Sequence, residues 1–212
     1  DSFRIPQGEV SAFVGPSGSG KSTIFNLIER MYDIESGDIK YGTQSIYDVP
    51  ITNWRNKIGY VMQSNSMMSG TIRDNILYGI NREVLDEELV KYAKLANCHD
   101  FIMQFDDGYD TLVGERGLKL SGVQRQRIDI ARSFVKNPDI LLLDEATANL
   151  DSESEQKIQE ALEILMEGRT TIVIAHRLST IKKAGKIIFL DQGKITGEGT
   201  HVELMRNHEK YH

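Results

Sequence analysis

Short apolar runs alternate with amphipathic segments near both ends of this chain, and the alternation predicts strands and helices in turn. Runs typical of buried strands cover residues 9–14, 38–41, 57–61, 140–143, 170–174 and 186–190. Helical periodicity covers residues 21–31 and 152–166, and a last helix is predicted to begin at Thr200. The segment Asp191-Gln192-Gly193-Lys194 is typical of a hairpin turn. Strand–helix repetition of this kind predicts an α/β fold with a mostly parallel sheet.

The middle of the chain has a different pattern, in which helical periodicity continues without strand-like runs. Residues 87–96 and 124–135 are amphipathic, and Thr71-x-x-Asp74 is typical of a helix N-cap. We therefore expect a single domain over residues 1–212. Its core would comprise residues 1–70 and 136–212, and a helical subdomain without strands would be inserted at 71–135.

Composition narrows the classes of function. The 212 residues are 40% apolar, which is enough for a core, and a formal net charge of −6 argues against a nucleic-acid-binding surface. The single cysteine, Cys98, excludes a disulfide framework and favours a small buried side chain. No apolar run approaches the ~18–20 residues of a membrane span, so any membrane link is expected through a partner or through a part of the protein that is absent from this sequence. Because the chain opens at Asp1 in a strand-like run, we expect it to be a piece of a longer protein.

A glycine-rich loop follows the first predicted strand and opens the first predicted helix. Its pattern, Gly15-x-x-x-x-Gly20-Lys21-Ser22, is typical of loops whose backbone N–H groups surround phosphates. The candidate nucleotide-binding residues are Gly15, Pro16, Ser17, Gly18, Ser19, Gly20, Lys21, Ser22 and Thr23. Lys21 would reach the terminal phosphates of ATP, and the Ser22 hydroxyl could bind Mg²⁺. The alternative is a glycine-rich turn with a surface lysine.

Two acidic residues end the buried run at 140–143. The carboxyl ends of parallel strands form the edge where ligands of open α/β sheets bind. Asp144 can therefore hold Mg²⁺ directly or through a water, and Glu145 is placed to orient or deprotonate the water that attacks the γ-phosphate. The alternative is that the Asp-Glu pair caps the following helix.

The turn Leu120-Ser121-Gly122-Val123-Gln124 precedes a predicted helix, whose N-terminus would offer a second anion site. One chain already has a phosphate loop, so a second anion site suggests that two copies pack head to tail. Ser121, Gly122 and Gln124 would then touch the ATP of a second copy. The alternative is an ordinary serine cap before a helix with solvated arginines, which are Arg125, Arg127 and Arg132.

In this order the motifs resemble those of ABC-type ATPases over essentially the whole chain. The exporter branch is indicated by residues 111–117, TLVGERG, and residues 68–76, MSGTIRDNI, resemble bacterial multidrug half-transporters. The resemblance implies a P-loop NTPase fold with a RecA-like core, an inserted all-helical signature subdomain, and N-terminal antiparallel edge strands that are largely missing. It implies an ATPase that powers export of a multidrug or lipid-like cargo.

The same resemblance implies further site residues and partners. Gln63 would contact Mg²⁺ and the attacking water, His176 would contact the γ-phosphate, and residues 146–151 would form the D-loop. The metal ligands would then be Ser22, Gln63 and Asp144, with ATP and Mg²⁺ as cofactors. The expected partners are a second ATPase domain and the transmembrane domains of a parent transporter at the cytoplasmic face of the membrane, and no nucleic acid.

Val123 departs from the family pattern, which has glycine at this position. A β-branched side chain adds bulk there and disfavours positive φ. A nucleotide-operated dimerisation switch with weak hydrolysis is therefore one alternative, and a soluble ABC-type ATPase is another. A P-loop small-molecule kinase would not explain residues 120–124. Cargo selectivity would reside in membrane segments that this sequence does not contain.

Overall fold

The computed structural model describes residues 2–16, 18–62, 67–115, 117–145 and 152–211. Contacts group the chain into two compact units. The first unit comprises Asp1–Gly59, Pro138–Glu145 and Gly168–His212, and the second comprises Tyr60–Asn137 and Ala146–Glu167.

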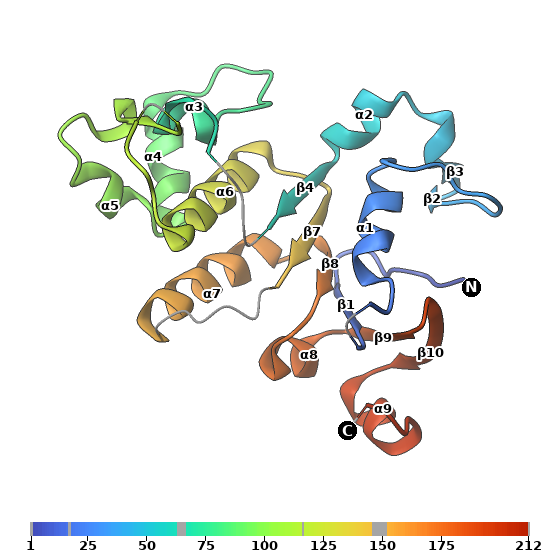
Figure 1. Ribbon diagram of the computed structural model, residues 1–212. Helices are drawn as coiled ribbons and strands as arrows, with labels where there is room; N and C mark the ends of the chain where they lie inside the picture. Colours follow the sequence, from blue (N-terminus) through green and yellow to red (C-terminus); the bar gives the residue numbers. More distant parts are fainter. Residues whose placement is uncertain (1, 17, 63–66, 116, 146–151, 212) are drawn as a thin grey trace. The chain divides into compact units, whose positions relative to one another are not determined.

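A six-stranded sheet forms the centre of the first unit (Figure 1). Its order is β10-β9-β1-β8-β7-β4, and the unit boundary falls within β4, the edge strand. The strands are β1 (Val10–Val14), β4 (Ile58–Val61), β7 (Ile140–Asp144), β8 (Thr170–Ile174), β9 (Lys186–Asp191) and β10 (Lys194–Gly199). The pairs β7–β8, β8–β1 and β1–β9 are parallel, and β9–β10 is antiparallel. The predicted mostly parallel sheet is confirmed.

Central strands of the sheet carry the core of this unit. Ala12, Phe13, Leu141 and Leu142 are fully buried, as expected for continuous apolar runs in strands that are covered on both faces. The remaining elements are α1 (Lys21–Ile28), β2 (Lys40–Tyr41), β3 (Gln44–Ser45), η1 (Ile46–Asp48), α2 (Ile51–Asn56), α8 (Leu178–Lys183) and α9 (His201–Asn207). Thr200 accepts a hydrogen bond from the Glu203 N–H, which confirms the predicted cap of α9.

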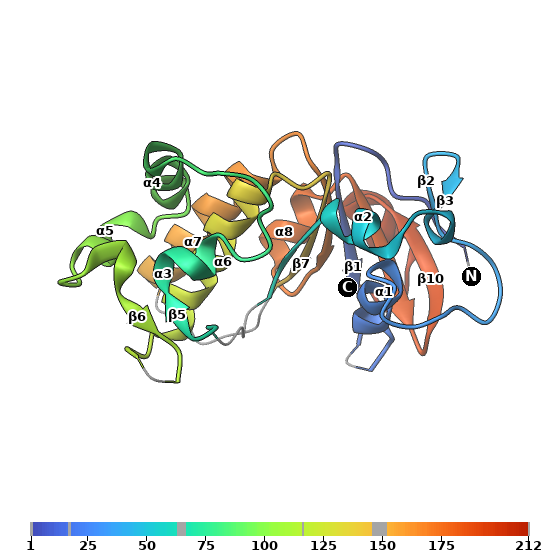
Figure 2. The ribbon, with the colours of Figure 1, turned by 90° about the horizontal axis from the view of Figure 1, so that it is seen from above.

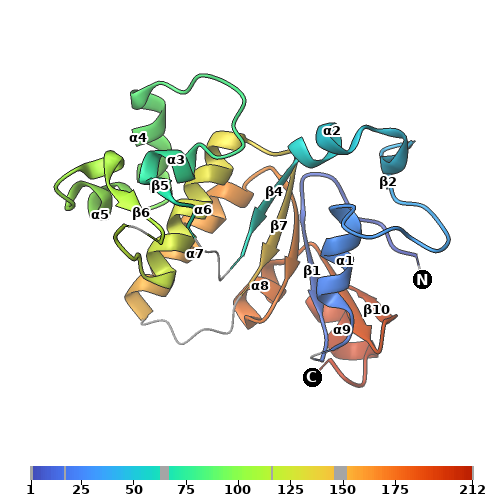
Figure 3. The same ribbon diagram turned by 45° about the horizontal axis from the view of Figure 1, so that its top comes forward.

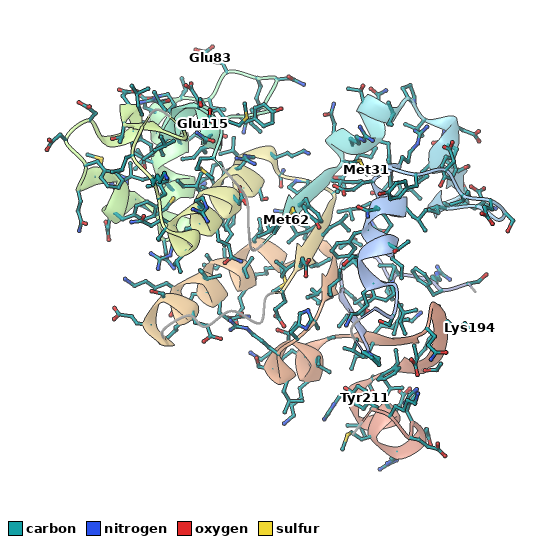
Figure 4. The ribbon with its side chains drawn as sticks, in the orientation of Figure 1. Met31, Met62, Glu83, Glu115, Lys194 and Tyr211 are labelled. Atoms are coloured by element: carbon teal, nitrogen blue, oxygen red, sulfur yellow. The ribbon has the colours of Figure 1, made fainter. Side chains whose placement is uncertain are left out.

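Helix α1 is shorter than the predicted 21–31. It ends at Ile28 because Arg30 takes a left-handed conformation, with φ of 59°, and its guanidinium donates to the Val49 carbonyl at 2.7 Å. Met31, labelled in Figure 4, is therefore 58% exposed instead of lying on the buried face of the helix. Helical periodicity could not predict this end of the helix, because it depends on a hydrogen bond between Arg30 and Val49, which are distant in sequence.

The predicted hairpin turn joins β9 and β10. Gln192 and Gly193 both have positive φ, 51° and 78°, which is the backbone of a type I′ turn. Lys194, labelled in Figure 4, begins β10 directly after the turn. The turn also contacts the glycine-rich loop, because Gly193 N–H donates to the Ser19 carbonyl.

The second unit is mainly helical. It contains α3 (Ile72–Ile76), α4 (Asp86–Leu95), α5 (His99–Met103), η2 (Gly108–Asp110), α6 (Gly122–Lys136) and α7 (Ser152–Met166). Helices α6 and α7 pack side by side (Figure 3). Sequence placed α7 in the core at 136–212, whereas the contacts group it with this unit. The predicted domain boundaries remain a prediction.

The expectation that residues 71–135 contain no strand is wrong in one place. β5 (Gly70–Thr71) pairs antiparallel with β6 (Leu112–Val113), as Figure 2 shows. The chain folds back sharply after β6, since Gly114 has φ of 93° and Leu118 N–H donates to the Leu112 carbonyl at 2.9 Å. Two residues per strand are too few to produce an alternating sequence pattern.

Cys98 lies in the core of the second unit. It is fully buried, as predicted, and burial raises the pKa of its thiol to about 12. The thiolate is the reactive form of cysteine, so this side chain is a structural one. In the described part of the chain, every helix is too short or too polar to cross a membrane.

Candidate nucleotide site

The glycine-rich loop connects β1 to α1 in the first unit, as predicted. Gly15, Gly18 and Gly20 have φ of 147°, 79° and 100°, a range that other residues rarely adopt. Gly15 is also held against β9, because a Cβ atom there would lie 2.0 Å from the Leu190 carbonyl oxygen. The loop therefore requires glycine for its backbone path as well as for close approach.

Helix α1 begins without a side-chain cap. Its N-cap residue is Gly20, which offers no side-chain acceptor to the first-turn N–H groups. A helix N-terminus of this kind attracts anions through its free N–H groups and its dipole. Ser22 and Thr23, in the first turn, are exposed. The free N–H groups at the start of α1 could therefore donate to a bound phosphate.

The β9–β10 turn supports the loop from behind, which the sequence did not predict. Gly193 N–H donates to the Ser19 carbonyl at 2.9 Å, and a Cβ atom on Gly20 would lie 3.7 Å from the Gly193 Cα. Residues near the other end of the chain thus fix the shape of the loop. A DQGK turn indicates a hairpin, but nothing in its sequence indicates what it touches.

Lys21, Asp144 and His176 come together at the carboxyl ends of β1, β7 and β8. Lys21 Nζ donates to the Gly15 carbonyl at 2.5 Å, so the side chain curls over its own loop. Burial lowers the pKa of Lys21, and the nearby Asp144 carboxylate partly opposes this effect. Burial likewise raises the pKa of Asp144, against the opposing charges of His176 and Lys21. Lys21 and Asp144 are both part-buried, and for each of them the effect of burial outweighs the compensation from neighbouring charges.

The oxygen donors at this edge fit Mg²⁺. The Ser22 hydroxyl and the Asp144 carboxylate are hard ligands of the type that Mg²⁺ prefers alongside phosphate oxygens and water. Among the described residues, no group of three or more His, Cys, Asp and Glu side chains could hold a metal by itself. The predicted residues Ser17 and Gln63 and the predicted D-loop at 146–151 lie outside the described residues.

A base for the attacking water would be expected to face the phosphate loop, but the Glu145 carboxylate is bonded elsewhere. Its side chain is buried, with 7% exposed. One carboxylate oxygen, Oε1, accepts from the N–H groups of His176 and Arg177 at 3.0 and 2.7 Å. The other, Oε2, accepts from the Thr180 hydroxyl at 2.5 Å. The carboxylate therefore binds the start of α8, a contact that no pattern in the sequence indicated.

The turn at residues 120–124 begins α6 in the second unit. Ser121 Oγ accepts from the Gln124 N–H at 3.2 Å, and Gln124 Oε1 accepts from the Ser121 N–H at 3.0 Å. This reciprocal capping box uses two of the N–H groups at the helix start. The N–H groups of Gly122 and Val123 make no hydrogen bond to the part of the chain that the structure describes. Two donors thus remain for an external acceptor.

Val123 has an ordinary backbone. It is the second residue of α6 and is not among the residues with positive φ. Two effects of Val123 were predicted, backbone strain at positive φ and added bulk. The strain is absent, so only the bulk of the side chain could affect a ligand.

The arginines of α6 are not simply solvated, which corrects that alternative. Arg125 donates to the Leu120 carbonyl at 2.7 Å, Arg132 donates to the Asn75 carbonyl at 2.8 Å, and Arg127 reaches the Asn97 carbonyl at 3.3 Å. Two of these contacts tie α6 to other segments of the second unit, and the Arg125 contact closes the turn that precedes α6.

Comparisons with known proteins agree with this geometry. The model of the family described as ABC transporter matches residues 1–148. The multidrug resistance ABC transporter ATP-binding and permease protein of Lactococcus lactis subsp. cremoris is 53% identical over 210 residues, which are 99% of this chain and 36% of that protein. A Staphylococcus aureus relative, whose name describes multidrug export and an ATP-binding/permease protein, is 54% identical over 207 residues, 98% of this chain and 36% of its own. The chain thus spans about a third of the length of these curated relatives.

Proposed function

Since this chain belongs to the ABC transporter family, whose ATP-binding domains are ATPases, we propose that it powers export of a multidrug or lipid-like cargo. The observation that carries the proposal is the phosphate loop, with its uncapped helix and with Lys21 beside Asp144. Both relatives described above carry ATP-binding and permease in their names, which supports a transmembrane partner for this chain. Its place would be the cytoplasmic face of the membrane.

The phosphate loop would bind the triphosphate of ATP. The N–H groups of the loop and of the first turn of α1 would donate to the phosphate oxygens, and Lys21 would exchange the Gly15 carbonyl for a terminal phosphate. Ser22 and Asp144 would hold Mg²⁺. Gln63 would be a third protein ligand, and this assignment rests only on the resemblance to ABC-type ATPases. When bound, Mg²⁺ would neutralise charge that develops on the phosphates.

Glu145 and His176 would serve the hydrolysis step. Glu145 would orient or deprotonate the attacking water, and His176, whose charge acts on Asp144, would contact the γ-phosphate. Gln63 would help to position the same water. We infer that the amides of Gly122 and Val123 in a second copy complete the site, because a capping box leaves them free of internal hydrogen bonds.

A second candidate function is a nucleotide-operated dimerisation switch with weak hydrolysis. Val123, in place of the family glycine, favours it, because a larger side chain stands beside the amides that would approach the partner's phosphate. A soluble ABC-type ATPase is less well supported, since the relatives are named as permeases.

The variant Glu145→Gln tests the ATPase proposal. The introduced side-chain amide would keep one oxygen as the acceptor for the two backbone N–H groups, and its NH₂ group would face the Thr180 oxygen, so the fold should be preserved. We expect turnover to fall at least ~100-fold, as for loss of a general base, with ATP binding retained. Single-turnover hydrolysis and equilibrium binding of ATP would measure the two effects separately.

Lys21→Ala is the matched comparison, because it removes a phosphate contact instead of the base. Here we expect ATP affinity itself to fall, by roughly 10- to 100-fold for one charge-assisted contact. Lys182→Ala, an exposed lysine on α8, is the control for loss of a positive charge. Near-normal hydrolysis by Glu145→Gln would show that another group activates the water.

A further inference from the structure

The contacts of Glu145 account for both of its carboxylate oxygens. Oε1 has two backbone donors and Oε2 has the Thr180 hydroxyl, all supplied by the segment that leads from β8 into α8. A buried carboxylate is costly unless its oxygens are hydrogen-bonded, so these three donors stabilise this position of the side chain. Thr180 supplies the only side-chain donor of the three.

In this position Glu145 is bonded to the segment that leads into α8, whereas, among the described groups, Asp144 is the carboxylate that acts on Lys21. Asp144 and Glu145 are successive residues at the end of an extended strand, so their side chains leave it in opposite directions. For Glu145 to reach a water beside the terminal phosphate, its carboxylate must turn away from Thr180.

We propose that Thr180 is a positioning residue that holds Glu145 in a resting position and must release it before hydrolysis. The proposal rests on the proposed role of Glu145 as the base. Thr180 would thereby keep turnover low until a conformational step, such as closure on a second copy, draws the carboxylate away. The backbone donors at residues 176 and 177 remain in every variant, so the threonine hydroxyl is the part of this contact that mutation can test.

Thr180 is well suited to this role by its burial and rigidity. Its side chain is 7% exposed, whereas the neighbouring Ser179 is exposed. A threonine has only two common χ1 rotamers in a helix, and in the one adopted here the hydroxyl donates to Oε2 of Glu145. Valine has nearly the same shape without the hydroxyl, and serine keeps the hydroxyl without the methyl group. These two substitutions separate the hydrogen bond from the packing.

The experiment compares Thr180→Val, Thr180→Ser and the exposed control Ser179→Ala in the purified intact protein. In Thr180→Val the Oε2 atom loses its donor, so release becomes easier, and we expect basal kcat at saturating MgATP to rise about three- to tenfold. The KM for ATP should stay within about twofold, because Thr180 does not touch the phosphate loop. Thr180→Ser and Ser179→Ala should behave like the parent. Thr180→Ala is a second hydroxyl-free variant if valine does not fold.

A readout that does not depend on turnover is hydrogen exchange at the amides of His176 and Arg177 without nucleotide. Glu145→Ala removes their acceptor and should speed exchange most, and Thr180→Val should speed it to a smaller extent. An unchanged or lower kcat in folded Thr180→Val, with unchanged exchange, would overturn the proposal for Thr180 alone, provided that Glu145→Gln abolishes turnover. Turnover retained by Glu145→Gln would instead overturn the proposed base, and with it the resting position.

Discussion

The phosphate loop and the turn at residues 120–124 both lead into helix N-termini for which we propose an anionic ligand, yet they are built in opposite ways. The first has glycine at the N-cap, no capping side chain, and charged groups that burial disfavours. The second has a complete capping box, and the arginines that follow donate to backbone carbonyls. The start of α1 has no side-chain cap, whereas the start of α6 is capped by its own chain at two of its N–H groups.

This difference indicates how each site relates to stability. An uncapped helix start with desolvated charges destabilises the folded chain until a ligand supplies the missing partners, as is usual where function requires strain. The capped start of α6 stabilises its own unit, and only the amides of Gly122 and Val123 remain to be shared. A terminus with two free donors is a partial site, which is consistent with the proposed completion by a second copy.

The comparison predicts that two glycines at these sites respond very differently to substitution. In Gly15→Ala the new Cβ would overlap the Leu190 carbonyl and the backbone would be strained at φ of 147°, so we expect a loss of ~3 kcal/mol or more in unfolding free energy. In Gly122→Ala the Cβ would meet only the Arg125 guanidinium at 3.7 Å, and alanine favours helix. Thermal unfolding of both variants would measure this, and equal losses of stability would contradict the comparison.

Val123→Gly tests whether bulk at the shared amides limits turnover. Valine keeps the N–H donor but crowds its approach, and lengthening one charge-assisted hydrogen bond corresponds to roughly tenfold in rate. We expect the turnover number to rise by about that factor in the dimer-forming intact protein, with a smaller effect on ATP affinity. Steady-state kinetics would measure both quantities.

Two results would separate crowding at Val123 from other effects. Glycine destabilises helix α6 by about 0.5–1 kcal/mol, so Val123→Ala, which restores helix propensity without the β-branch, is the matched control. Both variants should be faster than the parent. An unchanged or lower turnover number in both would show that valine is accommodated, as its ordinary helical backbone allows.

The smallest expected effect concerns Asp144 in the absence of nucleotide. Burial raises its pKa above the ordinary value of 3.8, so the charged carboxylate destabilises the folded state. This destabilisation is complete above the folded-state pKa, falls as pH decreases through that value, and vanishes below the unfolded-state pKa. Because Asp144 is half-buried, solvent screens much of this unfavourable effect of the charge. We therefore expect Asp144→Asn to raise Tm at neutral pH by only about 1–2 °C.

A pH series of melting curves checks the sign of this effect. The Tm difference between Asp144→Asn and the parent should shrink toward zero as pH falls below the folded-state pKa of Asp144. Asp139→Asn is the control, because its exposed carboxylate forms only a surface ion pair with Lys57 at 3.5 Å, and such pairs contribute little to stability. A difference that grows with acidification would mean that Asp144 stabilises the nucleotide-free fold.

Much of this protein was determined by local sequence. The apolar runs predicted the central strands, the glycine spacing predicted the phosphate loop, and the N-caps at Thr71 and Thr200 form as predicted. The ABC transporter family match confirms the predicted P-loop NTPase fold. These features depend on neighbours within a few residues or on a periodic pattern, so they can be predicted from one amino-acid sequence.

Tertiary structure alone decided the contacts that tune the site. The early end of α1 depends on Arg30 reaching Val49, and the shape of the phosphate loop depends on Leu190 and Gly193. The position of Glu145 depends on donors from His176, Arg177 and Thr180, 31 to 35 residues further along the chain. Hydrogen bonds between segments that are distant in sequence leave no periodic signal, because each involves one donor and one acceptor that only folding brings together.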